Sequence, residues 1–254
     1  MCNQFNIIQN RQNRQNRQNR QKTRILFVRG FNTYKFSSLD KDYYYYIKTF
    51  CLALEYDFDW FNYSPEEDFE EVYNRLDKTL KNKSKNYHII ISHSMGGGLI
   101  GLWATNNINR AKKMKKIIYL MPLLTDDNTM TRILTLIIPS FVAKNLVLPK
   151  TLILPNKLLW NDGNLLNDFY TKLIPIKQIY TMYNKLRAGD LDLRVVNLTN
   201  SFVIYASEEA LNILSPVSIM KIKPENLAVL PGKHILFWEA NHGEEFFKVL
   251  RQLL

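Results

Sequence analysis

The stretch Ile89-Ile90-Ile91-Ser92-His93-Ser94-Met95-Gly96-Gly97-Gly98 decides the fold of this chain. Its apolar start is typical of a buried strand, and the segment that follows, Leu99 to Ala104, is typical of a helix. A serine between a strand and a helix, with small neighbours, predicts a strained turn that lifts the Ser94 hydroxyl clear of the sheet. The same residues could also form a glycine-rich turn with an incidental serine. Residues upstream and downstream are needed to decide between the two interpretations.

The segment His93-Ser94-Met95-Gly96-Gly97 resembles the α/β-hydrolase superfamily, specifically its lipase and esterase branch. The general pattern there is Gly-x-Ser-x-Gly, and this chain has Ser92 at the first position. The resemblance covers residues 24–254. It implies a mostly parallel central sheet of about six strands flanked by helices, with a helical cap insertion at about 122–189. It also implies a triad in the chain order serine, acid, histidine.

The triad acid is expected after a late strand, and the segment from Ser201 to Ala206 is typical of one. Relatives in the superfamily place their acid about three residues beyond the small residue that ends this strand, which implies Glu209, with Glu208 as a close second. Either glutamate could instead cap the following helix, where a carboxylate is favoured by unpaired N–H groups. A third option is Asp126 or Asp127, because some relatives have their acid after the strand 117–121.

Relatives in the superfamily place the triad histidine in the loop after the last strand. Here that strand is expected at 226–230, and an amphipathic terminal helix with apolar residues from Phe246 to Leu253 is expected after the loop. His234 lies in that loop. Of the other histidines, His242 is next to the start of the helix and His88 opens the strand before Ser94. His93 is too close to Ser94 along the turn to act as its base.

These residue types suit acyl transfer. A serine hydroxyl needs a neutral imidazole to accept its proton, and a buried carboxylate holds that imidazole in the right tautomer. The resemblance implies two N–H donors for the oxyanion: that of Met95, after the nucleophile, and that of Phe31, in the loop after the first strand. The superfamily usually has His-Gly in that loop. Gly30 matches this, whereas Arg29 departs from it.

Apolar and helical segments alternate along the chain, which predicts a parallel sheet covered by helices on both faces. At 254 residues and 46% apolar content, the chain is long enough for one domain with a substantial core. Strands are expected at 24–28, 58–61, 89–91, 117–121, 201–206 and 226–230, and helices at 42–54, 65–80 (with Ser64 as cap and Pro65 in its first turn) and 99–104.

Residues 1–23 differ in composition from the rest. Asn-Arg-Gln repeats four times from Asn10 to Gln21, with no apolar face, which predicts a disordered tail. Residues 1–24 contain no acidic residue and account for six of the eleven net positive charges. Such a tail could contact an anionic membrane or nucleic acid weakly, or it could be a solvated repeat with no partner. The second interpretation is favoured, because the remaining charge of +5 is too small for a dedicated nucleic-acid binder.

No metal-ligand spacing, dinucleotide fingerprint or phosphate loop is present, so the sequence implies no cofactor. Cys2 and Cys51 make no disulfide framework, and no signal peptide or membrane-spanning run is found, so the default expectation is an intracellular, cytoplasmic protein. No obligate protein partner is inferred.

The expected cap contains an uncharged run from Ile133 to Ala143, which is too short to span a bilayer. It could be ordinary packing or an apolar wall for an acyl chain. The sequence thus predicts a serine esterase or lipase-like enzyme acting on a small-molecule ester or lipid. The alternative is a catalytically silent member of the same fold that binds or scaffolds.

Overall fold

The computed structural model of this chain describes residues 23–30, 38–125, 138–143, 145–149, 173–208, 216–234 and 243–254. Its central element is a six-stranded sheet in the order β2-β1-β3-β4-β7-β8, in which all neighbouring strands run parallel. The expected sheet of about six strands is confirmed. The strands are β1 (Arg24–Val28), β2 (Asp57–Phe61), β3 (Ile89–His93), β4 (Lys116–Leu120), β7 (Ser201–Ala206) and β8 (Leu227–Leu230).

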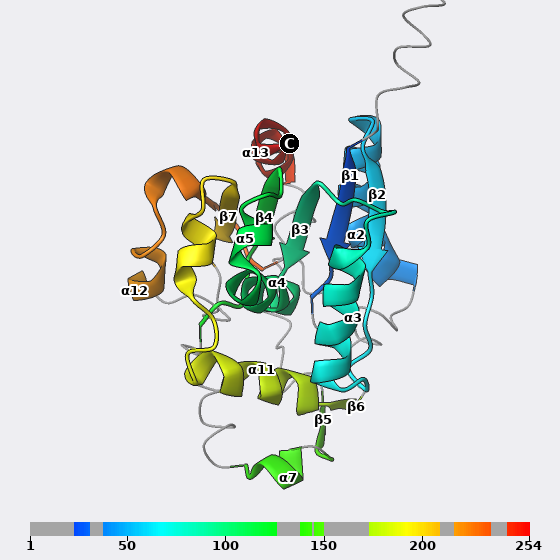
Figure 1. The fold of residues 1–254 in the computed structure, drawn as a ribbon, viewed down its shortest axis with the longest axis vertical. Helices are drawn as coiled ribbons and strands as arrows, with labels where there is room; N and C mark the ends of the chain where they lie inside the picture. The colour runs from blue at the N-terminus through cyan, green and yellow to red at the C-terminus, as the bar shows by residue number, and fades with distance from the viewer. Residues whose placement is uncertain are drawn as a thin grey trace, which may run out of the picture.

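Helices cover both faces of this sheet (Figure 1). The step from β1 to β2 runs in the opposite direction along the sheet from the steps β2 to β3 and β3 to β4. Because such crossovers are right-handed, α2 (Ser38–Ala53) covers one face, and α3 (Phe69–Lys81) and α4 (Met95–Asn106) cover the other. The terminal helix α13 (Gly243–Leu253) packs beside α2, since the ring centres of Phe247 and Phe50 lie 4.8 Å apart.

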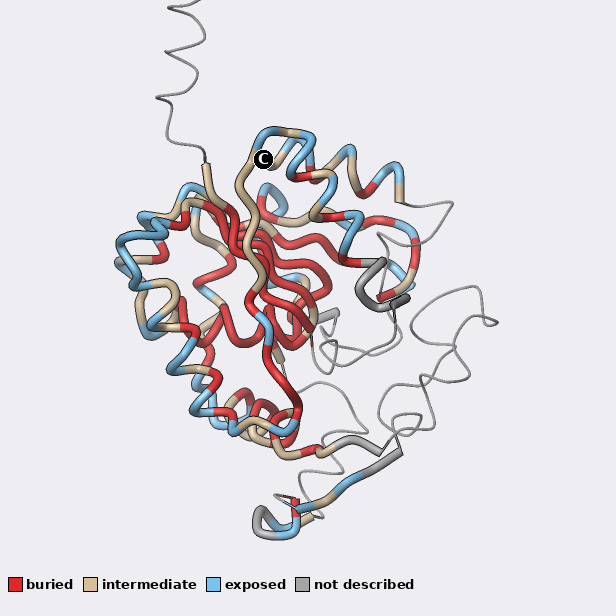
Figure 2. Tube along the Cα trace, turned by 90° about the vertical axis from the view of Figure 1, so that its right-hand side faces the viewer, coloured by how far each residue is buried: buried red, intermediate tan, exposed pale blue. Residues whose placement is uncertain are grey.

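The strands are apolar almost without interruption because both of their faces are covered. In β1, β3 and β4 the segments Ile25–Val28, Ile89–Ile91 and Ile117–Leu120 are buried. Figure 2 shows these buried strands in the middle of the molecule, with the exposed surfaces of the helices around them. The described fold also contains four short elements outside the expected insertion: α5 (Ile108–Ala111), η1 (Leu193–Asn197), α12 (Pro216–Ile219) and η2 (Pro224–Asn226).

Helix α3 starts at Phe69, so the predicted start at Pro65 with Ser64 as its cap is wrong. The Ser64 N–H donates to the Glu67 carboxylate, and the Ser64 hydroxyl accepts from the N–H of Glu66, so these residues close a turn before the helix. The cap is Asp68, whose carboxylate accepts the N–H of Glu70 at 2.9 Å. An aspartate satisfies the free N–H groups of a first turn as well as a serine does.

The described part of the expected insertion lies across the carboxyl ends of the strands (Figure 1). It contains α7 (Ser140–Ala143), α11 (Lys177–Arg187) and a separate antiparallel pair, β5 (Val147–Pro149) with β6 (Leu173–Pro175). Ala143, Ile176 and Tyr180 form a small cluster of their own. The first part of the apolar run 133–143, residues 133–137, lies outside the described residues, as does the tail up to residue 22. Within the described part of the chain, no helix is long and apolar enough to cross a membrane.

Candidate functional site

Ser94 and Met95 lie where the sheet changes the direction of its connections. The chain leaves β1 toward one face and β3 toward the other, and these two strands are neighbours. In open parallel sheets, such a switch point leaves a crevice outside the carboxyl ends of the strands, where ligands bind. The loop after β1 contains Arg29 and Gly30, and the turn after β3 contains Ser94.

Ser94 is the single residue between β3 and α4, and its backbone is strained. Its φ of 53° and ψ of −123° lie in a region that residues with a side chain rarely adopt. The turn is held by the Ser94 N–H, which donates to Leu120 at 3.0 Å, and by the Ser94 carbonyl, which accepts from Gly97 and Leu123 at 2.9 Å each. The Ser94 side chain does not cap the helix and is partly exposed. The predicted sharp turn is therefore present.

The small residues around the turn are required by close backbone contacts. A Cβ on Gly96 would lie 2.5 Å from the carbonyl oxygen of Val28, and one on Gly97 would lie 2.5 Å from the Cβ of Pro122. Ser92, which stands where the general pattern has glycine, is fully buried, and its hydroxyl donates to the carbonyl of Ile118 at 3.4 Å. The fold thus accommodates this departure from the pattern.

The loop after β1 lies directly against Ser94. A Cβ on Gly30 would lie 3.1 Å from the Cβ of Ser94. Arg29, the second departure, is buried, and its guanidinium carbon lies 4.4 Å from the ring centre of Trp60 and 5.1 Å from that of Tyr44. Its carbonyl accepts the Tyr63 hydroxyl at 2.9 Å. Phe31, the expected oxyanion donor of this loop, lies outside the described residues.

Met95, the other expected donor, is the first residue of α4 and is buried. The N–H groups in the first turn of a helix have no acceptor within the helix, and they point along its axis toward negative charge. An oxyanion forming at Ser94 would therefore meet the positive end of the α4 dipole.

His234 reaches the carboxyl end of β3 although its loop follows β8, three strands away in the sheet. The residue is 3% exposed. Its carbonyl accepts from His93 Nε2 at 3.1 Å, and the two imidazole ring centres lie 4.8 Å apart. Because His93 directly precedes Ser94, the structure brings the loop of His234 to the turn that holds Ser94.

The candidate acids are only partly described. Glu209 and the alternatives Asp126 and Asp127 lie outside the described residues. Glu208 is exposed to solvent, which is unfavourable for a triad acid, because that carboxylate works when buried. Its backbone N–H donates to the carbonyl of Gly232 at 2.9 Å, so the loop after β7 is joined to the loop of His234 two residues before it.

The other histidines lie in different settings. His88 is at the amino end of the sheet, where its Nδ1 accepts the backbone N–H of Arg24 at 3.4 Å, and His242 lies outside the described residues. His93 is 2% exposed, and burial, together with the nearby His234, holds its pKa well below the usual range for histidine. His93 is therefore neutral at physiological pH.

Sequence reasoning missed two residues of this region. Tyr44 of α2 is fully buried, and its hydroxyl lies 2.8 Å from His93 Nδ1. The run of four tyrosines from 43 to 46 gave no sign that one of them would reach the sheet. The exclusion of His93 as a base was a sequence prediction, but its contacts with Tyr44 and His234 depend on residues 49 and 141 positions away.

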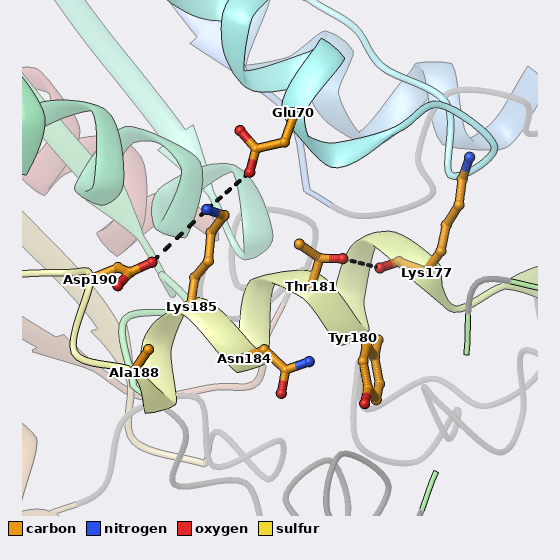
Figure 3. Close-up of a pocket in the computed structure, with 8 residues that line it drawn as sticks. All are labelled: Glu70, Lys177, Tyr180, Thr181, Asn184, Lys185, Ala188 and Asp190. Atoms are coloured by element: carbon orange, nitrogen blue, oxygen red, sulfur yellow. Dashed lines mark hydrogen bonds and ion pairs between the residues drawn. The ribbon is translucent and has the colours of Figure 1, made fainter. Parts of the chain in front are cut away.

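A surface pocket of about 340 Å³ lies elsewhere, between α3 and α11 (Figure 3). Lys185 Nζ pairs there with Glu70 at 2.9 Å and Asp190 at 3.9 Å, so its charge is compensated. The pocket includes none of the predicted site residues that the structure describes. Among the described residues, no group of three or more histidine, cysteine, aspartate and glutamate side chains could hold a metal ion.

Comparison with known proteins gives matches in structure alone: no protein-family model matches the chain, and no curated protein matches it significantly in sequence. A monoacylglycerol lipase from Paleococcus ferrophilus superposes with a TM-score of 0.61 at 16% identity, covering 91% of this chain and 95% of that one. A soluble variant of the Saccharomyces cerevisiae monoglyceride lipase gives 0.61 at 17% identity, covering 91% and 85%. Mouse alpha/beta hydrolase domain-containing protein 10 gives 0.54 at 16%, covering 91% and 88%. With its parallel sheet, its strained serine turn and these structural matches, the chain has the fold of the α/β-hydrolase superfamily.

Proposed function

We propose that this chain is a serine hydrolase that cleaves carboxylic esters with an apolar acyl group through an acyl-enzyme. Ser94 attacks the ester carbonyl while His234 accepts its proton and passes it to the leaving alcohol. Glu209 orients the imidazole of His234. The N–H groups of Met95 and Phe31 bind the oxyanion, and water then releases the acid by the same steps.

The observation on which this proposal rests is the strained turn at Ser94 together with the buried His234 bonded to its neighbour His93 at the same strand end. A left-handed φ at a residue with a side chain costs about 1–3 kcal/mol and persists at functional sites, where surrounding contacts fix it. Here the hydrogen bonds of the Ser94 backbone supply those contacts. The structural neighbours named above include two lipases that act on monoacylglycerols by name, which agrees with an ester as substrate.

A catalytically silent scaffold of the same fold is the competing interpretation. Its two grounds in the sequence were the departures at Ser92 and Arg29. Ser92 donates a hydrogen bond inside the sheet, and Arg29 stacks on Tyr44 and Trp60, so both have a packing reason that leaves the serine turn intact. The departures therefore no longer favour the silent interpretation.

The decisive experiment is labelling of the full chain with a fluorophosphonate probe, which reacts with an activated serine. We expect wild type to label and Ser94→Ala to lose labelling and ester hydrolysis. Ser92→Gly is the matched control: it changes the neighbouring serine to the residue usual in the pattern, and it should still label. A wild-type chain that stays unlabelled while folded would establish the silent interpretation.

The choice of acid is tested by comparing Glu209→Gln with Glu208→Gln. Loss of the acid leaves the imidazole without its orienting partner, so Glu209→Gln should lower kcat more than Glu208→Gln. The reverse order would move the acid by one residue, and two unaffected variants would point to Asp126 or Asp127.

The apolar acyl preference is tested with p-nitrophenyl esters of graded chain length. Each buried methylene is worth about 0.8 kcal/mol, so four more carbons gain at most about 3 kcal/mol if they are fully enclosed. After losses from fit and entropy, we expect butyrate to octanoate esters to exceed acetate at least about tenfold in kcat/KM. A flat profile would contradict the lipase-like part of the proposal while leaving the esterase part standing.

A further inference from the structure

A buried chain of hydrogen bonds passes beside Ser94 and joins the loop after β1 to the loop of His234. The Gly30 N–H donates to the Tyr44 hydroxyl oxygen at 3.2 Å, and that oxygen lies 2.8 Å from His93 Nδ1. His93 Nε2 in turn lies 3.1 Å from the carbonyl oxygen of His234. All four residues are buried. These hydrogen bonds therefore connect the loop after β1, helix α2, the end of β3 and the loop of His234, which are separate in the sequence.

The two backbone ends fix the direction of every bond in this chain. A carbonyl only accepts, so His93 Nε2 bears the proton that it donates to His234. A neutral imidazole has one N–H, so Nδ1 accepts, and the Tyr44 hydroxyl donates to it. The Tyr44 oxygen is then the acceptor for Gly30. A protonated His93 would oppose the Tyr44 hydroxyl with a second donor, and burial already disfavours that form.

The series of hydrogen bonds ends at Gly30, which lies against Ser94, and at His234, whose carbonyl is bonded to the residue before Ser94. Gly30 lies against Ser94 and directly precedes Phe31, one of the two proposed oxyanion donors. His234 is the proposed base, and the hydrogen bond is made by its own backbone. Tyr44 makes a second contact with the loop after β1, because the guanidinium of Arg29 lies over the Tyr44 ring. Tyr44 and His93 thus link the residue before Phe31 to the backbone of the proposed base.

We propose that Tyr44 and His93 are positioning residues, which hold the loop after β1 and the backbone of the base His234 in place beside Ser94. This inference rests on the proposed hydrolase function. Neither residue needs to touch substrate. Their effect comes through geometry, since displacing a reacting group by about 1 Å can cost about 100-fold in rate. The contribution is made mainly in the transition state, where the oxyanion exists and the imidazole is charged.

The test compares Tyr44→Phe with Tyr87→Phe. Tyr87 is also a buried tyrosine whose hydroxyl makes a short bond, at 2.6 Å to Asp59, but it lies at the amino end of β3, away from Ser94. Tyr44→Phe keeps the ring that packs on Phe27 and Trp60 and removes only the hydroxyl. We expect Tyr44→Phe to lower kcat and the rate of fluorophosphonate labelling at least about tenfold, with KM within about twofold of wild type. Tyr87→Phe should keep wild-type kcat.

Two variants of His93 separate positioning from packing. His93→Gln retains an amide that can donate to the His234 carbonyl, whereas His93→Leu cannot donate. The glutamine variant should therefore retain more kcat than the leucine variant. An equal loss of kcat in both variants would mean that only the shape of the His93 ring matters. It would overturn the proposal even if Tyr44→Phe lowers kcat.

A spectroscopic measurement is independent of turnover. In protein with ¹⁵N-labelled histidine, the His93 signals, assigned by their loss in His93→Gln, should report the neutral tautomer with the proton on Nε2. A proton on Nδ1 would overturn the proposal. A wild type that does not label at all would overturn both this proposal and the hydrolase function. If wild type labels, and Tyr44→Phe has the same kcat and labelling rate as Tyr87→Phe, this proposal alone would be overturned.

Discussion

The two ends of the parallel sheet satisfy their polar groups in different ways. At the amino end, charged pairs lie near the surface: Arg24 with Asp57 at 3.7 Å and Lys85 with Asp59 at 3.4 Å. At the carboxyl end, neutral groups are buried and bonded in series, from Gly30 through Tyr44 and His93 to His234. Water can replace a partner at the first end but not at the second. The same loss of one hydrogen bond should therefore matter little at the amino end and much at the carboxyl end.

The largest effect is expected from the residues proposed to do the chemistry. Ser94→Ala and His234→Ala should each lower kcat at least about 10³-fold, because removing either member disables the shared unit. Ser84→Ala, which changes an exposed serine near the amino end of β3, is the control and should keep wild-type activity. Ester hydrolysis measured beside thermal unfolding separates lost chemistry from lost fold, and full activity in Ser94→Ala would refute the assignment.

The next effect concerns the backbone contact under the serine turn. Gly96→Ala places a Cβ against the carbonyl oxygens of Val28 and Arg29, neither of which can move without shifting β1. We expect a loss of about 1–3 kcal/mol in the free energy of unfolding. Gly189→Asn is the comparison, because Gly189 has φ +79° but nothing within 4 Å of an added Cβ. Urea unfolding should show the smaller loss for Gly189→Asn; similar losses would mean that the backbone around Gly96 relaxes freely.

The buried histidine predicts a pH dependence of stability. His93 has its pKa held well below normal by burial and by His234, so between pH 7.5 and 5.5 the unfolded chain takes up a proton that the folded chain does not. The free energy of unfolding is therefore highest above about pH 7 and falls as the pH drops below the unfolded value of about 6.5, by up to about 1 kcal/mol at pH 5.5.

Among the described residues, the titratable and charged groups near His93 include Tyr44 from α2, Arg29 over the Tyr44 ring, and His234. His93→Gln binds no proton, so the difference in unfolding free energy between pH 7.5 and 5.5 should be smaller in this variant by about the same amount. Parallel pH curves for wild type and variant would show that His93 is not the group that titrates.

The smallest effect is expected at the amino end. Asp57→Asn removes the carboxylate that pairs with Arg24, but both side chains are partly exposed, at 40% and 32%. The free energy of unfolding should change by less than about 0.5 kcal/mol, and less still in high salt. A loss comparable with that of Gly96→Ala would erase the proposed difference between the two ends.

Much of the sheet could be predicted from the sequence because its strands are continuous apolar runs between breaks. The bounds of β1 and β7 match the predicted ones, whereas three helices start at other residues. Helix α4 begins at Met95, before the expected Leu99. The low helix propensity of glycine put the expected start after Gly96 to Gly98, but these residues are helical because they pack closely on neighbouring backbone. Helix α2 begins at Ser38 and not at Asp42, and the start of α3 was decided by local turn hydrogen bonds.

The candidate site likewise has one part that could be predicted from the sequence and one part that could not. A serine at a strand–helix junction has a local signature, so the turn at Ser94 could be predicted. The partners of Tyr44 and His93 could not, because a hydrogen bond between distant residues leaves no spacing in the sequence. The antiparallel pair β5–β6 was missed for a similar reason, since each strand has three residues and no alternation to detect.

The strand order also has a consequence for synthesis on the ribosome. β4 ends at Leu120, but its partner β7 begins only at Ser201. At about 5–20 residues per second, the fully apolar edge of Ile117 to Leu120 waits about 4–16 s for the strand that covers it. An uncovered strand edge can pair with another chain. β4 is therefore the segment of the nascent chain most in need of a chaperone, and slower translation between residues 120 and 201 should lower the yield of soluble protein.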